Sequence, residues 1–326
     1  MPDIVVPVIQ SVFVIATLLG GFAYMTLWER KLVGRIQIRY GPNRVGPFGL
    51  LQPIADGIKL AFKEATAPMG ADKWVYPLAP VISVVAALTS FAVIPIGPDI
   101  NVFGTSIPLQ LSNASVGILF TLAMSSLGVY GIVLAGWSSN NKYSLLGGMR
   151  SSAQMISYEL SLGMSLIGVL MITGSLRLSD VVAMQATVPF VVLQPIGFVV
   201  YSIAAIAEVN RAPFDLPEAE TELVAGYHTE YSGLKFAMFY MAEYINMITV
   251  SSIATTMFLG GWHGPFLSGP WWFFAKVVVL LSAFVWIRAT FPRLRYDRLM
   301  KLGWTFLMPL ALLNIVLTSV ALVVIK

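Results

Sequence analysis

Cysteine is absent from the 326 residues of this chain, and charged residues make up only 11% of it. Without thiolates, the chain cannot hold an iron–sulfur cluster, a c-type haem or a disulfide of its own. Its two histidines, His228 and His263, are far apart in sequence and make a poor case for haem or zinc. The sequence also lacks the glycine motifs that bind dinucleotides and phosphates. Any redox centre with which this chain works must therefore belong to a partner.

Apolar sequence is abundant instead, with 57% hydrophobic residues and a mean hydropathy of +0.79. A helix needs about 20 apolar residues to cross a bilayer. Eight runs qualify, so we predict an all-α, polytopic membrane protein that forms one integral membrane domain over residues 1–326. The predicted spans are 4–28, 76–94, 115–135, 151–172, 189–207, 234–259, 271–291 and 302–325.

Basic residues orient these spans. All lysines and arginines except Arg177, Lys276 and Lys326 fall on one side, which the positive-inside rule assigns to the cytoplasm. The predicted cytoplasmic loops are 29–75, 136–150, 208–233 and 292–301. Both termini then lie on the outer side. The net charge of +4 reflects this asymmetry and gives no reason to expect a nucleic-acid partner.

The first cytoplasmic loop contains a second kind of helical pattern. Between residues 47 and 65, apolar residues recur at three- and four-residue steps, and polar residues occupy another face. This pattern predicts an amphipathic helix at the cytoplasmic surface of the bilayer. A plain membrane anchor would explain it. Asp56, an acid between Ala55 and Gly57, favours a further role.

The third cytoplasmic loop is the most acidic part of the chain. Asp215 and Glu218 have the spacing of a capping box, and Glu222 would share a helical face with Glu218. Carboxylates that close together push their pKa values apart, so some can hold protons near neutral pH. A solvated acidic loop is the alternative. The acids between residues 208 and 231 are Glu208, Asp215, Glu218, Glu220, Glu222 and Glu230.

Two further acids fall inside predicted spans, Glu159 in the fourth and Glu243 in the sixth. Carboxylates within a bilayer are costly and usually face a protein interior or a water path. Each could be a neutral acid that only bonds a neighbouring helix. Because Glu208 and the acidic loop lie on the same side of the membrane as these two, we favour a hydrated proton path.

Four stretches of the sequence resemble one known family. They are ERKLVGRIQIRYGPNRVGPFGLLQPIADGIKLAFKE (29–64), GWSSNNKYSLLGGMRSSAQMISYEL (136–160), AEVNRAPFDLPEAETELVAGYHTEYSGLKF (207–236) and PRLRYDRLM (292–300). They are similar to the membrane protein designated H in bacterial respiratory complex I, the proton-translocating NADH:quinone oxidoreductase, and to its mitochondrial counterpart, NADH dehydrogenase subunit 1. The motifs are long, and together they run from Glu29 to Met300.

The resemblance implies a subunit of the bacterial inner membrane that carries no redox centre. It would form most of the chamber that admits quinone, the substrate, and would link quinone reduction to proton translocation. Its partners would be the peripheral-arm subunits with flavin and iron–sulfur clusters, the neighbouring small membrane subunits and the lipid bilayer. The positions that match the chamber side are Glu29, Arg30, Arg39, Asp56, Lys59 and Lys63.

The resemblance also implies roles for the acids. The positions that match the start of a proton relay are Glu159, Glu208, Glu218 and Glu243, and we add Glu222 because of its spacing from Glu218. Arg211 and Asp215 match the loop that supports them. A stand-alone proton or cation transporter, or the related membrane subunit of an energy-converting hydrogenase, would also use buried acids. Co-purification of iron–sulfur subunits separates the transporter from the complex.

Overall fold

In the computed structural model, which describes residues 2–102, 105–216 and 224–325, helices form nearly all of the regular structure. The one exception among these residues is a short antiparallel hairpin, in which Ile100 pairs with Ile107. The elements are α1 (Pro2–Ile36), η1 (Pro47–Gly49), α2 (Gln52–Phe62), α3 (Val75–Ser90), η2 (Phe91–Val93), β1 (Ile100–Val102), β2 (Thr105–Ile107), α4 (Gly117–Ser138), α5 (Lys142–Thr173), α6 (Leu178–Met184), α7 (Phe190–Leu193), α8 (Pro195–Glu208), η3 (Gly226–His228), α10 (Gly233–Met257), α11 (Pro270–Thr290), α12 (Tyr296–Leu302), a π-helical turn (Gly303–Leu307) and α13 (Met308–Ile325).

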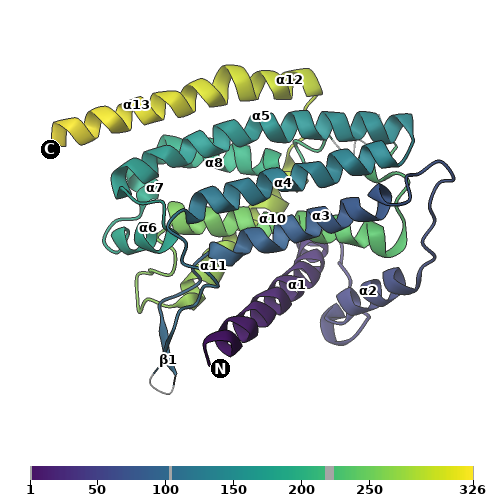
Figure 1. The fold of residues 1–326 in the computed structure, drawn as a ribbon, viewed down its shortest axis with the longest axis horizontal. Helices are drawn as coiled ribbons and strands as arrows, with labels where there is room; N and C mark the ends of the chain where they lie inside the picture. Colours follow the sequence, from purple (N-terminus) through teal and green to yellow (C-terminus); the bar gives the residue numbers. More distant parts are fainter. Residues whose placement is uncertain (1, 103–104, 217–223, 326) are drawn as a thin grey trace.

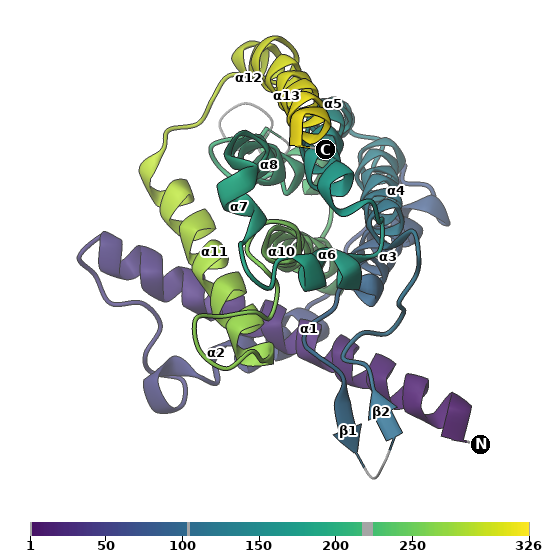
Figure 2. The same cartoon turned by 90° about the vertical axis from the view of Figure 1, so that its left-hand side faces the viewer.

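The long helices run roughly side by side, with α13 on the outside of α5 and α1 crossing the bundle at a steeper angle (Figure 1). Seen from the end, α10 is central, and α3, α4, α8, α11 and α1 surround it (Figure 2). Both chain termini, α6 and β1 lie toward the left of Figure 1, whereas α2 lies toward the right. The elements expected on opposite sides of a membrane therefore lie at opposite ends of the bundle.

Among the described residues, six helices are long and apolar enough to cross a membrane, so the chain is a membrane protein as expected from its composition. These are Val6–Ile36, Val75–Val93, Gly117–Ser138, Lys142–Thr173, Pro270–Thr290 and Tyr296–Val324; α8 is apolar but shorter. The remaining predicted span is α10, which carries Lys235, Glu243 and Asn246 among many hydroxyl residues. A helix surrounded by other helices need not present an apolar face to lipid. The polar composition of α10 is therefore compatible with its central place in the bundle (Figure 2).

Several boundaries differ from the sequence-based expectation. The predicted loop at 136–150 is almost entirely helical, because α4 continues to Ser138 and α5 already begins at Lys142. Asn141 starts α5 by accepting a hydrogen bond from the backbone N–H of Tyr143 over 2.9 Å, the usual role of an N-cap side chain. The expected span at 189–207 is interrupted at Gln194, between α7 and α8. The loop at 136–150 was predicted because the end of α4 and the start of α5 are rich in polar residues.

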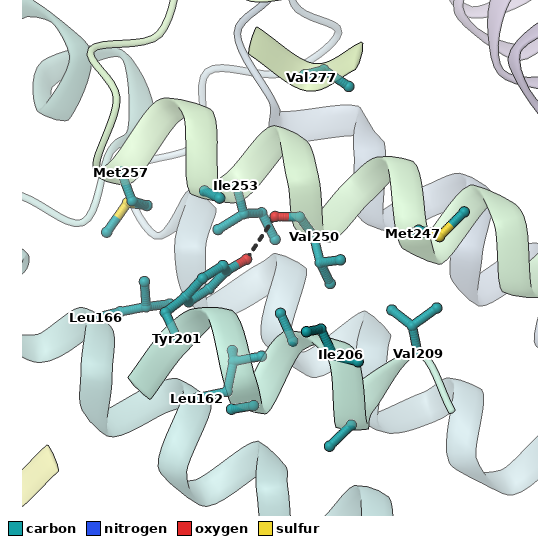
Figure 3. Packing of buried hydrophobic residues seen from close by; sticks show 14 of the residues in the cluster. Leu162, Leu166, Tyr201, Ile206, Val209, Met247, Val250, Ile253, Met257 and Val277 are labelled. Carbon is teal, nitrogen blue, oxygen red and sulfur yellow. Dashed lines mark hydrogen bonds between the residues drawn. The ribbon is translucent and has the colours of Figure 1, made fainter. Parts of the chain in front are cut away.

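Behind the acids the bundle is tightly packed and apolar. Tyr201 of α8 is 1% exposed and donates its hydroxyl hydrogen to the backbone oxygen of Val250 in α10, over 2.8 Å (Figure 3). Leu162 and Leu166 of α5 pack against it from the other side (Figure 3). This cluster fixes the spacing of α5, α8 and α10, the helices that carry Glu159, Glu208 and Glu243.

Lys276 secures the C-terminal end of α10. It belongs to the first half of α11, and its ammonium donates to the backbone oxygens of Leu259, Gly261 and His263 over 2.6, 2.9 and 2.5 Å. The last carbonyls of a helix have no partner within the helix, and a cation near them is favourable. Lys276, one of two lysines expected on the outer side, is therefore a helix-terminating contact in the structure.

A buried charge network and a chain of acids

The centre of the site is an arginine between two glutamates. Arg211 contacts the Oε1 atom of Glu29 through Nη1 at 3.1 Å and the Oε1 atom of Glu243 through Nε at 2.5 Å. Arg288 also pairs with Glu29 Oε1, and Tyr244 donates its hydroxyl hydrogen to Glu29 Oε2 over 2.5 Å. The side chains of Glu29 and Arg211 are each 8% exposed and that of Glu243 is 15% exposed. Arg211 and the two carboxylates thus lie largely buried, and Arg288, whose side chain is 41% exposed, completes the charge balance.

Four separate elements supply this network: α1 gives Glu29, α10 gives Glu243 and Tyr244, the last turn of α11 gives Arg288, and the segment after α8 gives Arg211. The guanidinium of Arg211 also lies over the ring of Tyr244, 4.4 Å from its centroid. Such a cation–π contact adds roughly 0.5–2 kcal/mol, the most when desolvated. The network therefore joins α1, α10, α11 and the segment after α8, in addition to grouping their charges.

Gln154 holds the segment that carries Arg211. It lies in α5, is fully buried, and its Nε2 atom donates to the backbone oxygens of Ala207 and Phe214, each over 2.8 Å. These two carbonyls bracket Arg211 in sequence, so one amide fixes the turn on both sides. Gln154 is not among the site residues predicted from the sequence, although a glutamine inside an apolar span is a recognisable indication of a buried polar contact.

Burial lowers the pKa of Arg211, but the neighbouring Glu243, Tyr244 and Glu29 outweigh it and raise this pKa above its usual value. The guanidinium therefore stays charged at any physiological pH. Removing either partner of a buried ion pair typically costs ~3–5 kcal/mol, because it leaves the other charge uncompensated. The fixed charge of Arg211 makes the protonation of its two carboxylate neighbours sensitive to any new charge nearby.

A second pair of acids lies deeper, between α4, α5 and α8. Ser125 of α4 donates to Glu208 Oε1 over 2.8 Å, and the adjacent Ser126 donates to Glu159 Oε1. Glu208 is 5% exposed. Consecutive serines on one helix thus position acids from two different helices. The sequence analysis missed this pair of serines, and its only signal was their polarity within an apolar span.

The predicted chamber residues divide into two groups. Arg30 pairs with Asp56 across 2.7 Å, and Lys59 lies 3.6 Å from the other oxygen of that carboxylate, so α1 and α2 are tied together. Burial raises the pKa of Asp56, but hydrogen bonds from Arg30 and Gln52 bring it below its usual value, and the carboxylate stays ionised. Arg39 and Lys63 are exposed and do not join this group.

Other predicted site residues lie on the segments after α8. Glu218 and Glu222, with the proposed capping box, lie outside the described residues. Asp215 is half-buried on the segment of Arg211. His228, which could have opposed the acids when protonated, has its pKa lowered to about 4 by burial, so it is neutral at pH 7. Farther along, Asn141 donates to Glu230 Oε1 over 2.6 Å, which attaches this loop to the start of α5.

A large apolar cavity opens beside the network. Its volume is about 570 Å³, and it runs between α1 and α11 against the face of α10 that carries Ile248. Tyr24 and Trp28 line it from α1, and Phe274 and Val278 line it from α11. Trp28 is the residue before Glu29, so an elongated apolar molecule in this cavity would end next to buried charges.

The fold and the site together define a polytopic membrane protein with a buried, charge-balanced junction and a set of intramembrane acids. A family model described as NADH dehydrogenase matches residues 9–319, and the chain belongs to this family. Among its relatives are H subunits of NADH-quinone oxidoreductase. The chain is 55% identical to one of the two from Geobacter metallireducens, over 307 residues that cover 94% of this chain and 92% of the relative. It is also 55% identical to the H subunit of Thermomicrobium roseum over 312 residues, which are 93% and 92% of the two chains. The H subunit of Protochlamydia amoebophila is 54% identical over 297 residues, 91% of each chain.

Proposed function

We propose that this chain is the H-type membrane subunit of a proton-translocating NADH:quinone oxidoreductase. It forms most of the quinone chamber and carries no redox centre, while flavin and iron–sulfur clusters belong to peripheral-arm partners. The names of relatives more than 50% identical over nearly the whole chain support this assignment. The observation that carries the proposal at the level of the site is the Glu29–Arg211–Glu243 contact, because it joins the chamber segment to the intramembrane acids.

In this proposal the chamber lies between α1, α2 and α10, under the peripheral subunits. Glu29, Arg30, Asp56 and Lys59 supply its charged wall, and Arg39 and Lys63 face the partner. The apolar cavity that ends at Trp28 fits the tail of a quinone, which is long and apolar. The head group, which must accept two electrons and two protons, would then lie near the charges.

The proposed coupling is electrostatic. Charge that appears on the quinone inside a low-dielectric chamber interacts more strongly with buried groups than it would in water. Glu29 is the first of the acids to interact with that charge. Arg211 forms ion pairs with both Glu29 and Glu243, so a change in the charge at Glu29 alters the ion pair with Glu243. A change at Glu243 then shifts protons among Glu208 and Glu159, and among Glu218 and Glu222 on the loop. Arg211 and Asp215 support that loop.

Affinity purification and labelling test this function. We expect a tagged chain to co-purify with iron–sulfur subunits, and a photoreactive quinone analogue to label peptides within residues 29–64 or 236–248 of the purified complex. The reason is that only the chamber brings both segments to the substrate. Excess unlabelled quinone provides the control, since it should suppress the labelling.

Two outcomes would contradict this proposal. A stand-alone transporter would purify alone or as a homo-oligomer, without iron–sulfur subunits. Labelling confined to α13 or to the loops near α6 and β1 would place quinone away from the charged network. Co-purification with hydrogenase subunits would favour the energy-converting hydrogenase alternative.

We also propose the membrane arrangement. The whole chain forms one domain in the bacterial inner membrane, and α8 and α10 cross it in addition to the six long apolar helices. The helix α2 lies at the cytoplasmic surface as an amphipathic element, and both termini are periplasmic. The distribution of lysine and arginine supports this orientation.

The absence of native cysteine allows a direct test of orientation. Ser112→Cys, at an exposed position after the hairpin, should react with an impermeant maleimide added to intact cells. Ala65→Cys, at an exposed position after α2, should react only after the membrane is opened. The parent chain, which has no thiol, is the control. The reverse pattern would invert the proposed arrangement.

A further inference from the structure

Polar residues form a row along the central helix. Glu243, Asn246 and Thr249 of α10 are spaced three residues apart, so each is a neighbour of the next on the surface of the helix. Glu243 belongs to the charge network, and Thr249 lies at the level of the deeper acids. Asn246 lies between them, and its amide makes no hydrogen bond to any residue that the structure describes.

Two small cavities meet at Asn246. One, of about 40 Å³, is lined by Glu243, Asn210, Glu208 and Asn246. The other, of about 20 Å³, is lined by Glu159, Thr249, Glu208 and Asn246. Glu208 and Asn246 are thus common to both. The first cavity reaches the charge network through Glu243, and the second reaches Glu159.

Both cavities have the properties of buried water sites. A water molecule needs a cavity of roughly 10–15 Å³ and two to four polar partners. Residues that line the cavities carry buried polar atoms without a hydrogen-bond partner among the described residues: Asn210 Oδ1 at the larger, Thr249 Oγ1 at the smaller, and Glu208 Oε2 at both. Because a buried polar atom without a partner is destabilising, water in these cavities is favoured.

We propose that Asn246 is a positioning residue that joins these two cavities into one hydrated path from Glu243 past Glu208 to Glu159. This inference rests on the proposed relay and deepens it. The amide of Asn246 orients water in both cavities, because it can donate through its nitrogen on one side and accept through its oxygen on the other. Glu208 takes a proton from the water of one cavity and later releases one into the other, so its net charge is unchanged after each passage. Asn246 itself exchanges no proton.

The test uses two substitutions in the intact complex. Asn246→Leu keeps the number of side-chain heavy atoms and the branch at Cγ but makes the junction apolar, whereas Asn246→Ser keeps a polar group and leaves room for another water. We expect the leucine variant to lower quinone-linked proton pumping about tenfold or more, and the serine variant to retain most of it. Flavin-site activity with an artificial acceptor should be unchanged in both. Asn314→Leu is a matched control, since Asn314 bonds Gln194 in a buried contact and lines neither cavity.

Infrared difference spectroscopy supplies a readout that a structural role would not change. The redox-induced carboxyl band that disappears in Glu208→Gln should exchange hydrogen for deuterium more slowly in Asn246→Leu than in the parent, and at the parental rate in Asn246→Ser. An equal loss of proton pumping in both Asn246 variants would overturn the inference. So would a hydrogen–deuterium exchange rate of the carboxyl band in Asn246→Leu that equals the parental rate. If Asn246→Leu pumps normally while the glutamate variants fail, this inference is wrong and the relay stands. If the glutamate variants also behave like the parent, the relay itself is wrong.

Discussion

Replacing Arg211 by methionine is expected to prevent stable assembly of the complex. Arg211 is the only described cation that contacts both Glu29 and Glu243, and its removal leaves Glu243 without its ion-pair partner in the interior. Breaking a buried pair in this way costs ~3–5 kcal/mol, which is a large share of the stability of most domains. The amount of assembled complex on native gels, and its thermal stability in detergent, would measure the loss.

Two further variants make this prediction sharper. Arg211→Lys keeps the charge but presents a single ammonium in place of the planar group that contacts two carboxylates at once, so an intermediate loss is expected. Arg298→Met, at an exposed position in α12, is the matched control and should assemble normally. If Arg211→Met assembles and melts like the parent, the network is not a structural junction.

Glutamine at Glu159, Glu208 or Glu243 is expected to leave an assembled complex that reduces quinone and pumps protons far more slowly. Glutamine keeps the size and hydrogen bonding of glutamate but cannot ionise. Loss of a group that transfers protons commonly lowers a rate by about 10²-fold or more. Quinone-linked turnover and proton pumping in proteoliposomes would be compared with flavin-site activity, which should stay at the parental level.

Glu208→Gln is the clearest of the three. Glu243 neutralises Arg211, so its replacement also disturbs the charge network. Glu208 instead accepts a hydrogen bond from the hydroxyl of Ser125, and the side-chain oxygen of a glutamine can still accept that bond. Glu64→Gln, an exposed position after α2, serves as the control. Parental pumping in all three variants would mean that these carboxylates only hold the helices together.

The sequence was enough to predict a helical membrane protein and the family, because composition and long motifs are local properties. It could not predict the pairing of residues that are far apart in the chain. Glu29, Arg211 and Glu243 were assigned to the chamber, the loop and the relay respectively, yet the structure joins them in one network. Only the crossing of α1 over α10 brings them together.

Sequence-based prediction gave weight to ionisable residues in apolar spans and little weight to neutral polar ones. It selected Glu159 and Glu243 because ionisable groups in a bilayer are conspicuous. It passed over Gln154, the serines at 125 and 126, and Asn246, whose neutral side chains cost less to bury and attract less attention. Their importance is visible only once the neighbouring helices are in place.

The central position of α10 has a consequence for how the protein is made. During synthesis each helix must leave the translocon for lipid, where a charged residue at the middle of a helix costs about 2.5–3.5 kcal/mol. α10 carries Glu243 and a row of polar groups, so lipid alone is a poor solvent for it. Of the helices that surround it (Figure 2), α1, α3, α4 and α8 are made earlier, and only α11 follows. We therefore expect α10 to insert against helices of this chain that are already in the membrane, and not into lipid alone.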